Sequence, residues 1–108
     1  MPIDPYYRQL VMAGLHEAAQ TQAGTSCATF CNFPMTVYGK TGTAVHAGER
    51  DQSWYVCFVP DGARSIVLAV TIPKGGFGAA AAAPAARLML SEWFGLPEKW
   101  QAGTSPDL

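Results

Sequence analysis

Hydrophobic residues near the N-terminus recur at every third or fourth position, which predicts an amphipathic helix with one buried face. Asp4 and Pro5 form a helix start, with a capping carboxylate before a proline at the first helical position. The predicted stripe consists of Tyr7, Leu10, Val11, Gly14, Leu15 and Ala18. Further on, Thr25 is positioned to cap a short second helix that carries Cys27, Phe30 and Cys31.

The middle of the chain predicts three β-strands, at Tyr38–Ala44, Ser53–Pro60 and Ser65–Ile72. The last two runs are apolar at both odd and even positions, which is typical of strands covered on both faces. The turn residues Pro60-Asp61-Gly62 join them. We therefore expect an α+β fold, an antiparallel three-stranded meander with the Tyr38–Ala44 strand on the outside. Helices at both ends of the chain should cover the two faces.

A glycine-rich turn, Gly75-Gly76-Phe77-Gly78, leads into a predicted helix from Ala79 to Phe94 that Gly95-Leu96-Pro97 ends. The turn superficially fits a dinucleotide fingerprint. No strand with an acidic residue follows about twenty positions later, so this reading is rejected and the glycines are expected to allow close packing on the sheet. The chain divides into residues 1–95, the folded part, and residues 96–108, a polar tail.

Composition narrows the classes of function. The net charge of −1 provides no basic surface, so nucleic acid is not expected as a partner. Charged residues make up only 14% of the chain, which suggests surfaces that another polypeptide covers. No apolar run is long enough to span a bilayer, and the N-terminus lacks the pattern of a signal peptide, so any anchor or export segment should lie elsewhere.

The three cysteines and two histidines do not predict a metal site or a cofactor. Cys27 and Cys31 are four positions apart, Cys57 lies in a strand, and neither His16 nor His46 has a ligand-type spacing to them. Buried free thiols are the favoured interpretation, with a disulfide as the alternative. His16 falls outside the apolar stripe and is expected at the surface, and His46 is expected in a mobile polar loop.

The stretch Tyr38-Gly39-Lys40-Thr41-Gly42-Thr43-Ala44 carries the candidate chemistry. In a strand, Tyr38 and Lys40 face one way while Thr41 and Thr43 face the other. Gly42 lets a ligand backbone come close, and the hydroxyls and the ammonium are suited to bind a carboxylate. A phosphate-binding loop is excluded, because that motif needs a glycine where Pro34 stands and precedes a helix.

Lys40-Thr41-Gly42 is a motif of penicillin-binding proteins and β-lactamases. With the following SWYVCFVP strand and the GGFGAAAAAPAARLML segment, the chain resembles the C-terminal part of a class B penicillin-binding protein, a D,D-transpeptidase of peptidoglycan synthesis. The resemblance extends from about Pro5 to about Gly95. It implies that Lys40 sets the electrostatics of the site and that Thr41 and Thr43 bind the carboxylate of a stem peptide or β-lactam. The Thr43 backbone N–H would form half of an oxyanion hole.

The resemblance also implies a Ser-x-x-Lys nucleophile and a Ser-x-Asn motif, and this sequence contains neither. We therefore expect the chain to be inactive alone and to act with a partner, the remainder of the transpeptidase domain. The parent enzyme would work at the extracytoplasmic face of the bacterial plasma membrane. In the family, earlier strands complete the sheet, so the outer edge at Ser65–Ile72 should be unsatisfied here. The alternative hypothesis is a non-catalytic module that binds a peptide or protein along an exposed edge strand.

Overall fold

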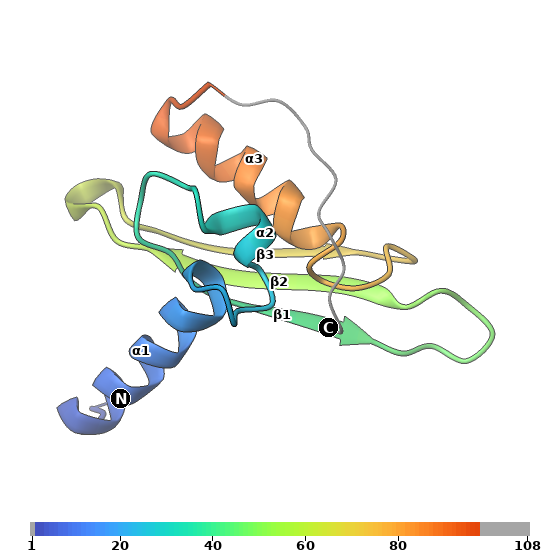
Figure 1. Cartoon of the computed structure of the whole chain (residues 1–108), viewed down its shortest axis with the longest axis horizontal. Helices are drawn as coiled ribbons and strands as arrows, with labels where there is room; N and C mark the ends of the chain where they lie inside the picture. Colours follow the sequence, from blue (N-terminus) through green and yellow to red (C-terminus); the bar gives the residue numbers. More distant parts are fainter. Residues whose placement is uncertain (1, 98–108) are drawn as a thin grey trace.

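A computed structural model describes residues 2–97 and contains a three-stranded antiparallel sheet with helices before and after it (Figure 1). The strands lie side by side in the order β1-β2-β3. In chain order the elements are α1 (Pro5–Gln20), α2 (Cys27–Phe30), β1 (Tyr38–Ala44), β2 (Gln52–Val59), the 3-10 turn η1 (Gly62–Arg64), β3 (Ile66–Ile72) and α3 (Ala82–Phe94). The predicted α+β meander, with the lysine strand at its edge, is confirmed.

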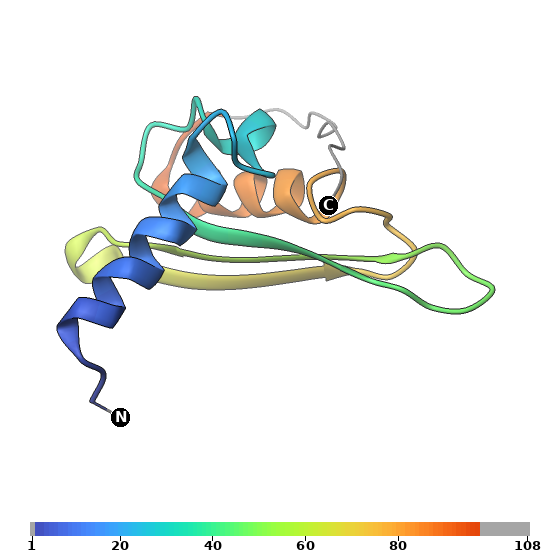
Figure 2. The same cartoon turned by 60° about the horizontal axis from the view of Figure 1, so that its bottom comes forward.

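One face of the sheet is covered and the other is largely open. Along β2, Tyr55 and Cys57 are buried, whereas Trp54 and Val56 on the opposite face are exposed. The two faces differ because α2 and α3 lie on the same side of the sheet and cover only that face (Figure 2). The prediction that helices cover both faces is wrong. The apolar residues of β2 and β3 do occupy both faces, but only one face is covered in this chain.

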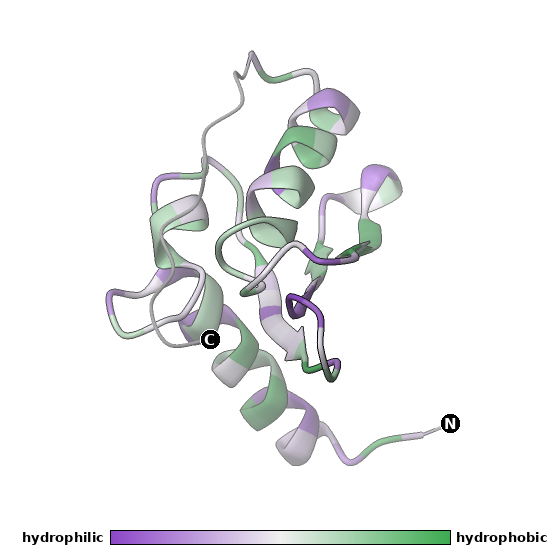
Figure 3. Cartoon of the chain, turned by 90° about the vertical axis from the view of Figure 1, so that its right-hand side faces the viewer, coloured by the Kyte–Doolittle hydropathy of each residue, from purple (hydrophilic) through white to green (hydrophobic). Residues whose placement is uncertain are grey.

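Helix α1 crosses the edge of the sheet beside β1, so that it lies partly on each side (Figure 2). Asp4 caps its start by accepting a hydrogen bond from the Tyr6 N–H (2.8 Å), as the sequence predicts. The first half of its apolar stripe, however, is exposed: Leu10 and Val11 retain 55% and 61% of their accessible surface, whereas Leu15 and Ala18 are half-buried. Figure 3 shows these hydrophobic segments along α1, which projects away from the sheet. The predicted buried face is therefore wrong for the first half of this helix.

The core lies between the covered face and the helices, and Tyr55 is at its centre. The Tyr55 ring stacks on Phe30 of α2, with 5.2 Å between ring centroids. Its phenol oxygen lies 3.1 Å from the Ser26 hydroxyl, so the one polar atom of this buried side chain has a hydrogen-bond partner. Leu90 and four small residues of α3 and the segment before it complete the packing: Ala79, Ala82, Ala83 and Ala86. The small side chains let α3 approach the sheet closely.

Helix α3 begins at Ala82, three residues later than predicted, and a residue from another element caps it. The Ser53 hydroxyl of β2 accepts a hydrogen bond from the Ala82 N–H and donates one to the Phe77 carbonyl, both 2.9 Å. The helix ends at Phe94 because Gly95 adopts the left-handed conformation (φ 71°), as its sequence predicts. Of the predicted tail, residues 98–108 lie outside the described residues.

Two of the three cysteines differ from the favoured interpretation of buried free thiols, and the third agrees with it. Cys27 and Cys31 form a disulfide across α2, whereas Cys57 is a buried free thiol. A four-residue separation brings two side chains together on consecutive helical turns, and here oxidation links them. Within residues 2–97, no helix is both long and apolar enough to cross a membrane.

Candidate functional site

Strand β1 places Lys40 on an edge strand of the sheet. The side of β1 away from β2 is bordered by α1 rather than by another strand. Lys40 is exposed, and its Nζ donates a hydrogen bond to the Thr41 carbonyl (3.0 Å). This contact holds the ammonium against the strand backbone and leaves its remaining N–H groups available.

Thr41 and Thr43 lie on the opposite face of β1 from Lys40, as the alternation predicts. The Thr41 side chain is only 5% exposed, and its Oγ1 lies 2.8 Å from the Oγ1 of Thr25. Thr25 therefore contacts β1 and does not cap α2, whose N-cap position is Ser26. The Thr43 hydroxyl accepts a hydrogen bond from the Gly78 N–H (3.3 Å). The structure therefore orients the two hydroxyls through Thr25 and Gly78.

Gly39 of the strand and Gly78 of the glycine turn permit close contacts that a side chain at either position would block. A β-carbon on Gly39 would lie against the phenol of Tyr55, 2.7 Å from its Cζ. At Gly42 the close neighbour is the glycine turn, because a β-carbon on Gly78 would lie 2.7 Å from the Gly42 carbonyl oxygen and 2.9 Å from its nitrogen. The expected close approach at Gly42 is thus made partly by the protein itself. The prediction that the glycine-rich turn packs on the sheet is confirmed.

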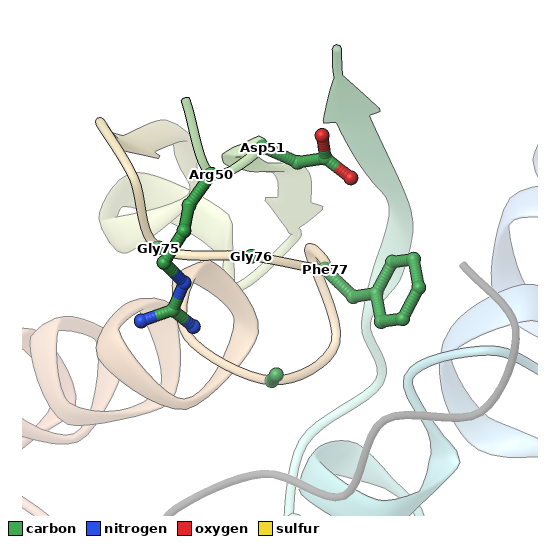
Figure 4. A pocket seen from close by; sticks show the side chains of 6 residues that line it. Arg50, Asp51, Gly75, Gly76 and Phe77 are labelled. Carbon is green, nitrogen blue, oxygen red and sulfur yellow. The ribbon is translucent and has the colours of Figure 1, made fainter. Parts of the chain in front are cut away.

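An open pocket of about 390 Å³ lies between the β1–β2 connection and this glycine turn (Figure 4). Arg50, Asp51 and Phe77 line it together with Gly75, Gly76 and Ala80. The Arg50 guanidinium and the Asp51 carboxylate point in different directions in this view. The Gly76 N–H donates to the Asp51 carbonyl (2.9 Å), which links the turn to the loop. Residue patterns did not single out Arg50 or Phe77, because only folding brings the two loops together.

A second groove, of about 490 Å³, separates α1 from the open face of the sheet. Tyr38, Phe58 and Pro60 form the sheet side, and Met12 and His16 are among the residues on the helix side. His16 is half-buried, not at the surface as predicted, since its Nδ1 lies 3.4 Å from the Val37 carbonyl oxygen and its ring lies near that of Tyr38. His46 lies in the exposed connection, where its Nε2 is 3.0 Å from Oε1 of Gln52.

Burial disfavours ionisation of Cys57 and Tyr55, the two core groups whose pKa is shifted. Burial raises the pKa of the Cys57 thiol to about 12, so the reactive thiolate is scarce at neutral pH. Burial also raises the pKa of Tyr55, although its hydrogen bond with Ser26 opposes the effect. No group of three or more His, Cys, Asp or Glu side chains in the described part of the chain could hold a metal ion.

The chain is thus part of an α+β domain, with the Lys40-Thr41-Gly42 sequence on the outer strand of its sheet. The sequence matches the family described as the penicillin binding protein transpeptidase domain over residues 1–91, and the chain belongs to this family. Its structure is similar to that of Pseudomonas aeruginosa PBP2 in complex with WCK 5153, with a TM-score of 0.77 and 25% sequence identity. The similarity covers 96% of this chain but 22% of the PBP2 chain. A search of curated proteins found no match.

Proposed function

We propose that this chain is the C-terminal segment of a peptidoglycan D,D-transpeptidase, the enzyme that cross-links stem peptides through a serine acyl-enzyme. The observation that carries the proposal is Lys40-Thr41-Gly42 on an edge strand within a transpeptidase-family domain. In this proposal Lys40 supplies positive potential, and Thr41, Gly42 and Thr43 form the wall that receives the terminal carboxylate of a stem peptide or β-lactam. The Thr43 backbone N–H serves as one oxyanion donor.

The site requires a second polypeptide segment for catalysis. None of the five serines is followed three residues later by lysine or two residues later by asparagine. Removing one oxyanion donor costs about 3–4 kcal/mol of transition-state stabilisation, and removing the nucleophile costs much more. We therefore infer that the chain is inactive alone and that its partner is the remainder of the transpeptidase domain.

The open face of the sheet supports a covering partner. Trp54, Val56 and Val67 expose apolar side chains on this face, and Val67 retains 70% of its accessible surface. Several exposed apolar side chains on one face of a sheet are typical of a surface that another polypeptide covers. The chain spans 22% of the length of the PBP2 chain that it resembles, so a complete domain has ample additional polypeptide to cover it.

The disulfide supports a site of action outside the cytosol. Disulfides persist in oxidising compartments such as the bacterial periplasm and are rare in the cytosol. The Cys27–Cys31 bond therefore agrees with the extracytoplasmic face of the plasma membrane, where a peptidoglycan transpeptidase meets its substrate.

The decisive experiment uses a labelled penicillin and intact-mass spectrometry. The chain alone should form no covalent adduct, whereas a mixture with a polypeptide that carries the Ser-x-x-Lys and Ser-x-Asn motifs should become acylated on that partner. Stoichiometric acylation of this chain alone would contradict the proposal and reveal an unrecognised nucleophile.

A variant of Thr43 tests the role of the strand in the assembled domain. Thr43→Val keeps the shape and the backbone N–H but deletes one hydrogen bond to a charged group, worth about 1.5–3 kcal/mol. It also removes the acceptor of the Gly78 N–H, so the Tm is measured beside the acylation rate. Acylation should slow by roughly ten- to a hundredfold, since each 1.4 kcal/mol is one decade. Thr36→Val, at an exposed threonine before β1, is the matched control. Acylation of Thr43→Val at the parent rate would refute the role assigned to this strand.

The alternative is a non-catalytic module that binds a peptide along an edge strand, favoured by the absence of a further strand beside β3 in residues 2–97. Light scattering separates the two proposals. A transpeptidase segment with an uncovered sheet should associate at high concentration, and a stable monomer that binds extended peptides would favour the module.

A further inference from the structure

We propose that Thr25 is a positioning residue for the Lys-Thr-Gly strand, because its hydroxyl fixes the orientation of the Thr41 side chain. The inference rests on the proposed function, in which Thr41 belongs to the carboxylate-binding wall. Thr25 lies 16 positions before Thr41 and belongs to the segment between α1 and α2. No motif of the strand itself includes it.

The contact between the two threonines is short and partly buried. Their Oγ1 atoms are 2.8 Å apart, and Thr41 is 5% exposed. A threonine in a strand can adopt more than one χ1 rotamer, and its hydroxyl hydrogen rotates to suit its partners. A hydrogen bond to a fixed neighbour favours the rotamer that keeps the two oxygens together. Thr25 therefore favours the rotamer in which the Thr41 hydroxyl points toward the α1–α2 segment.

Thr25 can act as a fixed neighbour because the residues on both sides of it are held. The adjacent Ser26 is buried, donates a hydrogen bond to the Ala18 carbonyl (3.1 Å), and contacts the Tyr55 phenol oxygen. A β-carbon on Gly24 would lie against the backbone carbonyls that end α1, so this residue packs directly on the helix. Side chains that orient a binding group are effective when they are themselves held by packing and hydrogen bonds.

The Cys27–Cys31 disulfide holds the segment from its other end. It closes the single turn of α2 immediately after Thr25 and Ser26. Arg87 of α3 donates a hydrogen bond to the Thr29 carbonyl in the same turn. These contacts hold the α1–α2 segment in place on the covered face. The hydroxyl of Thr25 connects this segment to Thr41.

The first measurement reads the orientation of Thr41 directly in the full chain. Three-bond NMR couplings to the Thr41 γ-methyl group should report one χ1 rotamer in the parent and in Thr25→Ser, which keeps the hydroxyl. Thr25→Val deletes the hydroxyl at nearly constant shape and should give rotamer-averaged couplings, and Thr25→Ala serves if valine prevents folding. Thr36→Val is the control and should behave as the parent. Unchanged Thr41 couplings in Thr25→Val or Thr25→Ala overturn the proposal.

The second measurement separates positioning from a merely structural role. Titration with D-alanyl-D-alanine, followed on the β1 amide resonances, should give a Kd about fivefold weaker for Thr25→Val, the effect of losing one neutral hydrogen bond. Thr25→Ser should restore the parent Kd. The double variant with Thr41→Val should bind no more weakly than Thr41→Val alone, because Thr25 acts through Thr41. If the losses of affinity in the two single variants add up in the double variant, the proposal is overturned. If the parent shows no titration, the proposed carboxylate site is refuted, and the couplings alone decide the role of Thr25.

Discussion

Replacing Gly78 with alanine should damage the fold and the candidate site together. Gly78 is buried where the glycine turn crosses β1 and β2. A β-carbon there would lie against the Trp54 carbonyl oxygen, as well as 2.7 and 2.9 Å from the Gly42 oxygen and nitrogen. All three atoms belong to the strand backbones, so none of them can rotate away. The turn must lift from the sheet, which breaks the hydrogen bond from the Gly78 N–H to the Thr43 hydroxyl.

The expected loss follows from these contacts. Overpacking of a close-packed site costs about 1–3 kcal/mol, and the lost hydrogen bond adds about 1 kcal/mol. We therefore expect Gly78→Ala to lower the free energy of unfolding by about 3 kcal/mol. At 4–8 °C per kcal/mol for a domain of about this size, the Tm should fall by roughly 12–24 °C.

Urea unfolding followed by tryptophan fluorescence measures this change, at a concentration low enough to suppress association. An unchanged m-value would show that the variant unfolds from a comparably compact state. Gly14→Ala is the matched control, because a β-carbon in the middle of α1 meets no atom within 4 Å. It should stabilise the chain by about 0.5–1 kcal/mol through helix propensity. Equal stability of Gly78→Ala and the parent would refute the packing argument.

Three further predictions concern the cap, the buried core and the open face. Ser53→Ala removes the hydroxyl that caps α3 and should lower the free energy of unfolding by about 1–3 kcal/mol in urea titrations. A change below about 0.5 kcal/mol would exclude a capping role. Burial raises the pKa of Cys57 to about 12 and also raises that of Tyr55. The free energy of unfolding should therefore be highest below the unfolded pKa of Cys57, near 9, and should fall as the pH rises from 9 to 12. Equilibrium unfolding that is flat across that pH range would contradict this. Val67→Lys on the open face should reduce association in light scattering without lowering the Tm, and unchanged association would place the contact elsewhere.

The strands could be predicted closely from sequence because turn residues bound them. Tyr38–Ala44 matches β1 at both ends, and the other two predicted strands differ from β2 and β3 by one residue at each shifted end. Proline, aspartate and glycine at the β2–β3 turn favour a reversal that needs no tertiary information. The start of α3 lies three residues later than predicted, because the residue that caps it, Ser53, is far away in the sequence.

The exposed surfaces were predicted incorrectly for a single physical reason. The apolar stripe of α1 and the second apolar face of β2 have the composition of buried surfaces, but local patterns do not indicate which polypeptide covers them. The candidate site shows the same limit. The alternation of Lys40 and Thr41 follows from strand geometry, whereas the Thr25–Thr41 contact depends on how a loop folds back onto the sheet.

The Cys27–Cys31 bond also affects how the protein should be produced. A chain made in a reducing cytosol retains two thiols at α2, and the bond can form only after the chain meets an oxidant. Material purified from such a source would be heavier by two hydrogen atoms and would lack the cross-link that closes the turn after Thr25. Preparations from different compartments can therefore share one sequence and differ in the segment that contacts Thr41.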